Sequence, residues 1–162
     1  MKELLMQYAA FNVWANKKLI DAILQLSDAQ QQQEITSSFP GIYKTLMHIW
    51  DAESIWWQRM NLQENFFRPS SQLTTIITEL ADGLDAQSKQ WKEWVSAADE
   101  IALHHVFAYR NIKGEPFESQ VWQVLQHLFN HGTYHRGQLV TMLRQVGITT
   151  IPATDFIAFT RV

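Results

Sequence analysis

A shortage of turn-forming residues is the feature that most constrains how this chain can fold. Its 162 residues include only six glycines and four prolines, about half the average usage. Such a chain favours a few long elements, and seven tryptophans and nine phenylalanines give helices large apolar surfaces to pack on. The absence of cysteine excludes a disulfide scaffold, thiolate zinc sites and a cysteine nucleophile.

Length and charge narrow the class of protein further. The length fits one domain over residues 1–162 with a sizeable core. A formal net charge of −3 gives no broad basic surface, so we expect no nucleic-acid partner. No apolar run approaches the roughly 20 residues that span a bilayer, and the N-terminus lacks the order of a signal peptide. We therefore expect a cytoplasmic protein without a membrane partner.

The hydrophobic pattern predicts long helices. Four are expected, over residues 2–26, from about 40 to just before 68, over 72–97 and over 118–145. Gly147 is typical of the position just past a helix end, and the tail after it is expected to pack on the helices. Between 99 and 118 the composition indicates a short hairpin or extended loop. The sequence thus predicts an all-α, antiparallel four-helix bundle, with a crossover connection as an option and a short hairpin or loop before the last long helix.

Histidine spacing is the strongest chemical signal. Of six histidines, His127, His131 and His135 recur every four residues and so stack along one side of the last predicted helix. At about 100° per residue, His135 falls inside the apolar stripe of that helix, His131 lies on its shoulder and His127 is turned toward solvent. A histidine that points into a core needs a hydrogen-bond partner or a metal, because an unpaired buried polar group costs about 1–3 kcal/mol.

His48 is the natural third member of a metal site, because it lies among apolar neighbours of the second predicted helix. Each histidine alone is more simply explained as an ordinary core or surface residue, but for the trio His48, His131 and His135 we favour one divalent ion. Neutral imidazole suits Zn, Ni, Cu or Fe, and three protein ligands leave positions open for water or substrate. His127 is expected beside this site. His104 and His105 are expected in a strand, pointing to opposite faces.

Several familiar motifs are missing. Gly132 follows His131, which excludes the His-Glu-x-x-His metalloprotease helix. The predicted last helix has no carboxylates near its histidines, as bundle di-iron proteins require. The sequence also lacks a nucleophile elbow, a phosphate loop and a dinucleotide fingerprint.

The segment Asn-His-Gly-Thr-Tyr-His-Arg-Gly-Gln-Leu at 130–139 closely resembles the signature of the DinB family, the DinB/YfiT-like metalloenzymes. The resemblance extends over nearly the whole chain. It includes Leu46-Met47-His48-Ile49 followed by Trp56, the N-terminal Tyr8, Asn12, Trp14 and Ala15, and the late Asp155 after Gly147 and Pro152.

The resemblance implies a four-helix bundle, often a homodimer, with one divalent ion held by three histidines. Carried over by position, the ligands are His48, His131 and His135, and the ion is Zn or Ni, or alternatively Fe. The wider superfamily includes S-transferases and isomerases that use low-molecular-weight thiols. Because this chain has no cysteine, any such thiol must arrive as a small molecule.

These observations favour a divalent-metal-dependent enzyme that acts on a small-molecule substrate, either a thiol-dependent S-transferase or a hydrolase. A non-catalytic metal-binding stress-response protein is the alternative, and an interaction module without metal is a third reading. Asp51 and Tyr134 are the catalytic candidates, although Asp51 also fits a solvated helix face.

Further candidates surround the predicted site. Arg136 fits a substrate carboxylate or a structural ion pair. Gln138 is placed to hydrogen-bond across the bundle, and Asp155 to pair with Arg136 or an imidazole. Gly137 is expected to allow a close helix approach. Four tryptophans are expected in the core or a dimer interface rather than in a binding site: Trp50, Trp56, Trp57 and Trp122.

Overall fold

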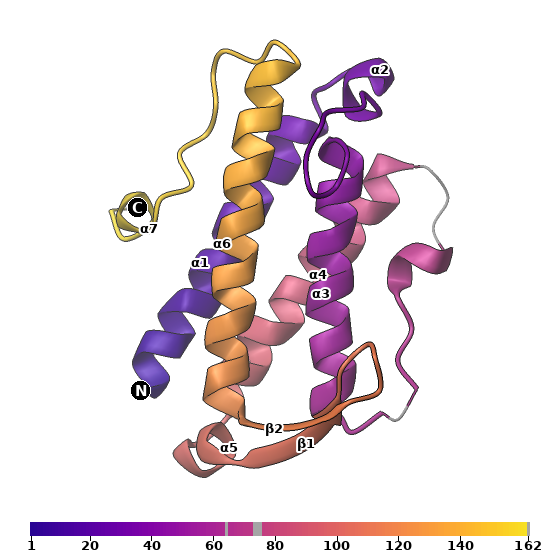
Figure 1. The fold of residues 1–162 in the computed structure, drawn as a ribbon. Helices are drawn as coiled ribbons and strands as arrows, with labels where there is room; N and C mark the ends of the chain where they lie inside the picture. The colour runs from indigo at the N-terminus through magenta and orange to yellow at the C-terminus, as the bar shows by residue number, and fades with distance from the viewer. Residues whose placement is uncertain (64, 73–75, 162) are drawn as a thin grey trace.

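Long helices make up most of the chain in the computed structural model, which describes residues 1–63, 65–72 and 76–161 (Figure 1). The long ones are α1 (Lys2–Ile23), α3 (Ile42–Met60), α4 (Ile77–Ala97) and α6 (Val121–Gln145). Shorter elements are α2 (Asp28–Gln31), the 3-10 helix η1 (Pro69–Gln72), α5 (Glu100–His104), β1 (Val106–Arg110), β2 (Pro116–Gln120) and α7 (Phe156–Phe159). Among the described residues, no helix is long and apolar enough to cross a bilayer.

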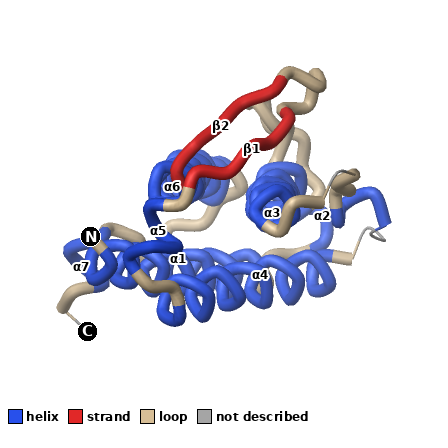
Figure 2. The backbone as a smooth tube through the Cα atoms, turned by 90° about the horizontal axis from the view of Figure 1, so that it is seen from below, coloured by secondary structure: helices blue, strands red, loops and turns tan. Residues whose placement is uncertain are grey.

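The long helices pack side by side in two layers. Figure 2 shows α3 and α6 in one layer and α1 and α4 in the other, and each helix contacts a neighbour in its own layer and one in the facing layer. In Figure 1, α1 and α6 rise while α3 and α4 descend, so α3 and α6 are antiparallel but α3 and α4 run in the same direction. The mostly helical architecture agrees with the prediction, and the connection from α3 to α4 is a crossover.

Four predicted helix boundaries were wrong. The second helix ends at Met60 rather than just before residue 68, and the last begins at Val121 rather than 118, because residues 118–120 belong to β2. The first helix ends at Ile23 because Ser27 caps a separate helix, α2, by accepting a hydrogen bond from the Gln30 backbone N–H. The third begins at Ile77 and not near residue 72, and residues 73–75 lie outside the described part of the chain. Ser70 lies before that helix, in η1. Its backbone N–H and hydroxyl both donate to the Asp51 carboxylate, at 3.1 and 2.6 Å, which holds η1 against α3.

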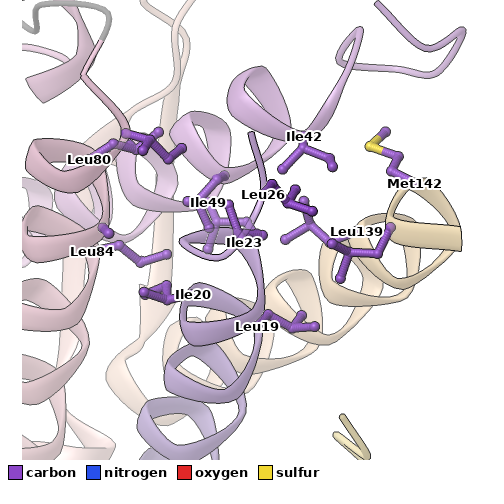
Figure 3. Packing of buried hydrophobic residues seen from close by; sticks show 14 of the residues in the cluster. Leu19, Ile20, Ile23, Leu26, Ile42, Ile49, Leu80, Leu84, Leu139 and Met142 are labelled. Carbon is purple, nitrogen blue, oxygen red and sulfur yellow. The ribbon is translucent and has the colours of Figure 1, made fainter. Parts of the chain in front are cut away.

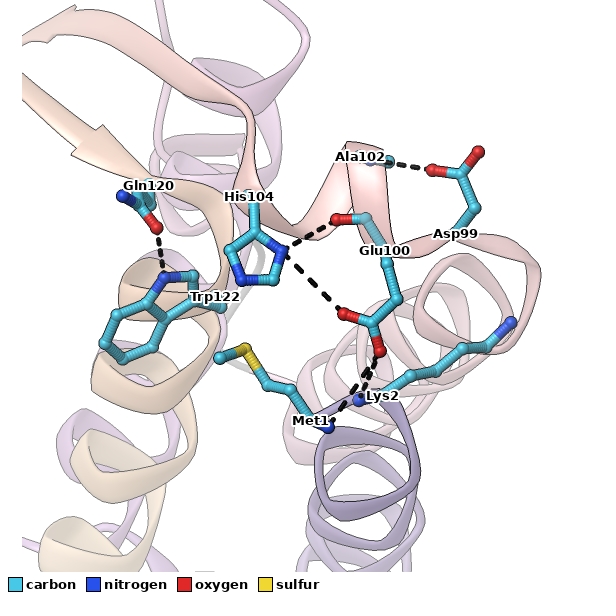
Figure 4. A network of polar contacts seen from close by, with 8 residues as sticks. All are labelled: Met1, Lys2, Asp99, Glu100, Ala102, His104, Gln120 and Trp122. Carbon is cyan, nitrogen blue, oxygen red and sulfur yellow. Dashed lines mark hydrogen bonds and ion pairs between the residues drawn. The ribbon is translucent and has the colours of Figure 1, made fainter.

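The expected hairpin is present. Strands β1 and β2 are antiparallel, with Val106 opposite Gln120 and Arg110 opposite Pro116. The strand assignment of the two histidines before it was wrong, because His104 ends α5 and His105 follows as its C-terminal cap. Figure 4 shows the cause: Asp99 caps α5 by accepting from the Ala102 N–H, and His104 Nδ1 lies 2.8 Å from the Glu100 backbone oxygen.

The core consists of two apolar clusters. Figure 3 shows the first, which includes Leu19, Ile49, Leu84 and Leu139. The second surrounds Trp91 and lies nearer the hairpin end. As expected, the tryptophans serve packing: Trp50 packs against the first cluster, and Trp56, Trp57 and Trp122 pack against the second.

The tail packs on α1, as expected from the sequence. The Phe156 ring stacks on Tyr8 with centroids 5.0 Å apart and meets Phe11 edge-on at 5.2 Å. Phe159 contacts Phe11 and Trp14. The chain leaves α6 through a Schellman motif, in which Gly147 has a φ of +93° and the Ile148 N–H donates to the Leu143 oxygen.

Candidate metal centre

Three histidines from two adjacent helices converge on one point. His48 projects from α3, and His131 and His135, one turn apart, project from α6. The Nε2 atom of His131 lies 2.9 Å from that of His48 and 3.1 Å from that of His135. All three ligand atoms lie within 4.8 Å of one another. We call these residues the histidine cluster, and no other described histidine, cysteine or carboxylate is grouped with it.

Gln138 fixes the proton of one cluster member. Its Oε1 lies 2.7 Å from His135 Nδ1, and because an amide oxygen only accepts, the Nδ1 of His135 must carry the hydrogen. The Nε2 lone pair of His135 therefore faces the other two rings. This is the tautomer and orientation that a metal-binding imidazole needs.

The electrostatics of the cluster favour neutral imidazoles. Burial, together with the charges of His135 and Arg68, lowers the pKa of His48 to about 4. Burial also lowers the pKa of His131 to about 3, with additional repulsion from His135, His48 and His127. The pKa of His135 is likewise lowered by burial, partly offset by its hydrogen bond to Gln138. At neutral pH the three nitrogens are thus available as ligands.

An aromatic side chain covers part of the cluster. The Phe39 ring, from the segment before α3, stacks on His48 with centroids 3.8 Å apart and planes 16° apart. The same ring meets His135 edge-on at 5.6 Å. Phe39 therefore shields two of the three imidazoles from water on one side.

The two catalytic candidates occupy different surroundings. Asp51 is buried and accepts a hydrogen bond from Ser70. The hypothesis that Asp51 lies on a solvated helix face was therefore wrong. Tyr134 is 62% exposed, and its ring meets that of His135 edge-on at 5.0 Å. His127 lies beside the cluster, its ring centroid 5.9 Å from that of His131 and 5.5 Å from that of Trp56.

Arg136 and Asp155 lie away from the cluster. Arg136 is 2% exposed, and its guanidinium donates to Asn12, Asn16 and Thr133. These hydrogen bonds hold the Arg136 guanidinium in the protein interior, so it does not face a substrate. Asp155 is exposed at the start of α7, where its backbone oxygen accepts from Ala158 and Phe159.

The sequence reading missed a buried polar layer formed by Asn12, Asn16, Glu53, Ser88 and Arg136. Both asparagines accept from Arg136 and donate to Glu53, and Ser88 donates to the other Glu53 oxygen at 2.8 Å. Burial raises the pKa of Glu53 to about 6 and lowers that of Arg136 to about 10. Every long helix contributes to this layer, and a signal was available in the polar residues that interrupt the apolar stripe of each.

Gly132, not Gly137, permits the close approach. A Cβ atom on Gly132 would lie 2.9 Å from both Arg136 Nη1 and Asn12 Oδ1, whereas one on Gly137 would meet nothing within 4 Å. The role expected for Gly137 was therefore wrong. The glycine between the cluster residues makes room for the polar layer.

Comparison with known proteins shows similarity to one family along the chain. The DinB family profile matches residues 1–161. Protein DinB of Bacillus subtilis (strain 168) is 28% identical over 155 residues, which cover 90% of this chain and 87% of that protein. The crystal structure of a DinB-like protein from Bacillus cereus ATCC 10987 matches with a TM-score of 0.72 at 23% identity, covering 93% of this chain and 95% of that one. The family match covers both helices that carry the histidines.

Proposed function

We propose that this chain, which belongs to the DinB family, is a divalent-metal-dependent enzyme with four-helix-bundle architecture whose ion is held by His48, His131 and His135. The observation that carries the proposal is the convergence of three neutral imidazole nitrogens within 4.8 Å. This donor set suits Zn, Ni or Fe. A bound ion supplies Lewis acidity toward a water molecule or a thiol.

Of the two reactions, transfer involving a low-molecular-weight thiol has better support from the surroundings. A metal ion lowers the pKa of bound water to about 7, and hydrolysis gains further from a general base within reach of that water. The nearby α3 carboxylates are engaged elsewhere, Asp51 by Ser70 and Glu53 by the polar layer. A thiol that coordinates a metal ion is deprotonated more readily than bound water, so it depends less on a protein base.

The chain's own residues would then position and shield the reactants. Gln138 orients His135 through its Nδ1 hydrogen, and Phe39 excludes water from one side of His48. The Tyr134 hydroxyl, on the exposed ring beside His135, is the candidate proton donor to a leaving group.

Metal content is the first test. Untagged wild-type protein should contain about one ion per chain by elemental analysis, and the triple alanine variant of the histidine cluster should contain none. His104→Ala, which removes an exposed histidine of α5, is the matched control and should keep the ion. No ion in the wild type after reconstitution would contradict the proposal.

A cobalt-loaded sample distinguishes the reactions. A small thiol added to it should produce a thiolate-to-cobalt absorption band, and that band should be absent from His48→Ala. Turnover with thiol and an electrophile should be lost in the same variant while its circular dichroism stays unchanged. A hydrolase would show no thiolate band and would act without added thiol.

The covering by Phe39 also supports one alternative, a non-catalytic metal-binding stress-response protein in which the ion stabilises the fold. In that case metal removal lowers the melting temperature steeply, and Phe39→Ala gains no reactivity. A homodimer and a cytoplasmic location belong to the proposal as expectations. Light scattering and cell fractionation check them.

A further inference from the structure

A second cationic site lies at the hairpin end of α3, outside the histidine cluster. Arg59, in the last turn of α3, is 9% exposed. Its guanidinium carbon lies 4.7 Å from the centroid of Trp56, 4.9 Å from that of Phe66 and 5.5 Å from that of Tyr109. Aromatic faces stabilise a cation but satisfy none of its N–H donors.

Arg59 lacks the partners that a buried guanidinium usually has. Its Nε is buried without a hydrogen-bond partner, and no carboxylate of the described residues forms an ion pair with it. Arg136, by contrast, has its donors bound by Asn12, Asn16 and Thr133. A buried donor without a partner is costly, and the guanidinium has no neutralising carboxylate among the described residues, so a bound anion would stabilise Arg59.

Two of the aromatic side chains around Arg59, Phe66 and Tyr109, line a cavity. It measures about 600 Å³ and is bounded by Arg59, Phe66, Tyr109 and Arg110 among others. Arg110, in β1, adds a second guanidinium, one of whose nitrogens donates to the Gly114 oxygen. The cavity thus combines two positive charges with flat apolar walls, which suits a planar carboxylate on a small molecule.

The cavity and the histidine cluster are on the same face of α3. Arg59 follows His48 by eleven residues, which is close to three full helical turns and a rise of about 16 Å. A continuous series of ring contacts joins them, because Arg59 lies over Trp56, Trp56 contacts His127 and His127 contacts His131. Allowing for the reach of both side chains, the spacing suits a molecule of about tripeptide length, roughly 10 Å.

From this geometry we infer that Arg59 forms a carboxylate-binding subsite, and that the small thiol acted on at the histidine cluster bears a carboxylate about a tripeptide length from its sulfur. This inference rests on the proposed function for the identity of the thiol. The subsite itself requires no metal, because its contacts come from Arg59 and its cavity alone.

Calorimetry with glutathione, a tripeptide thiol with two carboxylates, and with its uncharged diethyl ester tests the inference. Wild-type protein should bind the acid more tightly than the ester by about 10-fold or more. Arg59→Met should remove this preference, Arg59→Lys should keep part of it, and the exposed-site control Arg144→Met should keep it fully. No preference in the wild type, or a preference that persists in Arg59→Met, would overturn the inference.

Two further measurements keep the outcomes separate. The same titrations on metal-free protein should show weaker binding with the Arg59-dependent preference intact. If cobalt-loaded protein shows no thiolate band while that preference remains, the proposed function fails and the subsite stands. Arg59→Met should leave the melting temperature unchanged or raise it, since it removes an unpaired charge. A steep drop would assign Arg59 a structural role and overturn the inference.

Discussion

The histidine cluster and the buried polar layer are neighbours on the same helices, yet they differ in how their polar atoms are satisfied. His135 and Arg136 are adjacent in sequence, and both are almost fully buried. In the polar layer each donor meets an acceptor, from Arg136 through the asparagines to Glu53. In the histidine cluster three ring nitrogens face one another at 2.9–3.1 Å, although neutral imidazoles cannot all donate.

This difference in hydrogen bonding distinguishes a structural polar network from a candidate ligand site. A saturated network rigidifies and specifies the packing of the helices that share it. Where three ring nitrogens converge and not all of them can donate, a bound cation stabilises the lone pairs that are left without a donor. Polarity alone would not distinguish the two, whereas the count of donors and acceptors does.

Breaking the polar layer should have the largest effect on stability. Glu53→Ala leaves Arg136 buried without its counter-charge, which should cost about 3–5 kcal/mol of unfolding free energy. Urea denaturation measures this cost. The exposed control Glu93→Ala should change stability by less than about 0.5 kcal/mol. The double change Glu53→Leu with Arg136→Met should cost less than the sum of the two single changes, and strict additivity would contradict the coupling of the two charges.

The two glycines flanking the cluster residues give a matched test of packing. Gly132→Ala should destabilise the protein by about 1–3 kcal/mol, because the added methyl group meets Arg136 and Asn12. Gly137→Ala, with open space around it, should stabilise the same helix by up to about 1 kcal/mol. Equal effects of both changes in thermal unfolding would show that Gly132 makes no room for the polar layer.

The hydrogen bond to His135 should affect metal affinity rather than folding. Gln138→Ala removes the acceptor of the Nδ1 hydrogen and should weaken metal binding about 10- to 100-fold. Competition with a chelator measures this change, and unfolding of the metal-free protein should be almost unaffected. Gln126→Ala, an exposed change on the same helix, is the control. An equal loss of affinity in both variants would rule out an orienting role.

Acid should destabilise the metal-free protein through the histidine cluster. The pKa values of His48 and His131 in the fold are about 4 and 3, below 6.5, so the unfolded state binds more protons as the pH falls below 6.5. The neutral imidazoles of His48 and His131 therefore contribute their full stabilisation of the fold above about pH 6.5. The free energy of unfolding then falls as the pH drops toward 4.

Glu53 acts with the opposite sign. Its pKa in the fold, about 6, lies above 4.5, so its contribution favours folding below pH 4.5 and is lost as the pH rises through 6. Urea titrations at pH 7 and pH 5 should thus show a loss of stability in metal-free wild type that is smaller in His131→Ala. The same loss in both proteins would assign the acid sensitivity to other groups.

Much of the fold followed from the sequence because its signals are local. Helical periodicity located all four long helices, and Gly147 marked the end of the last one through its left-handed backbone. The hairpin was indicated by composition and a turn signal, which the Asn111 side chain completes by accepting from the Lys113 and Glu115 N–H groups. The prediction for the start of the third helix failed because a distant residue, Asp51, binds Ser70.

What the sequence by itself determined was the pair of histidines on one helix face, because a spacing of four fixes their alignment. Only the tertiary structure decided that His48 meets them, that Arg136 turns inward to the polar layer, and that Arg59 is buried among rings without a partner. Each of these depends on which helices pack together and in which direction. Periodicity along a single helix carries no such information, since it gives the face of each side chain but not what that face will meet.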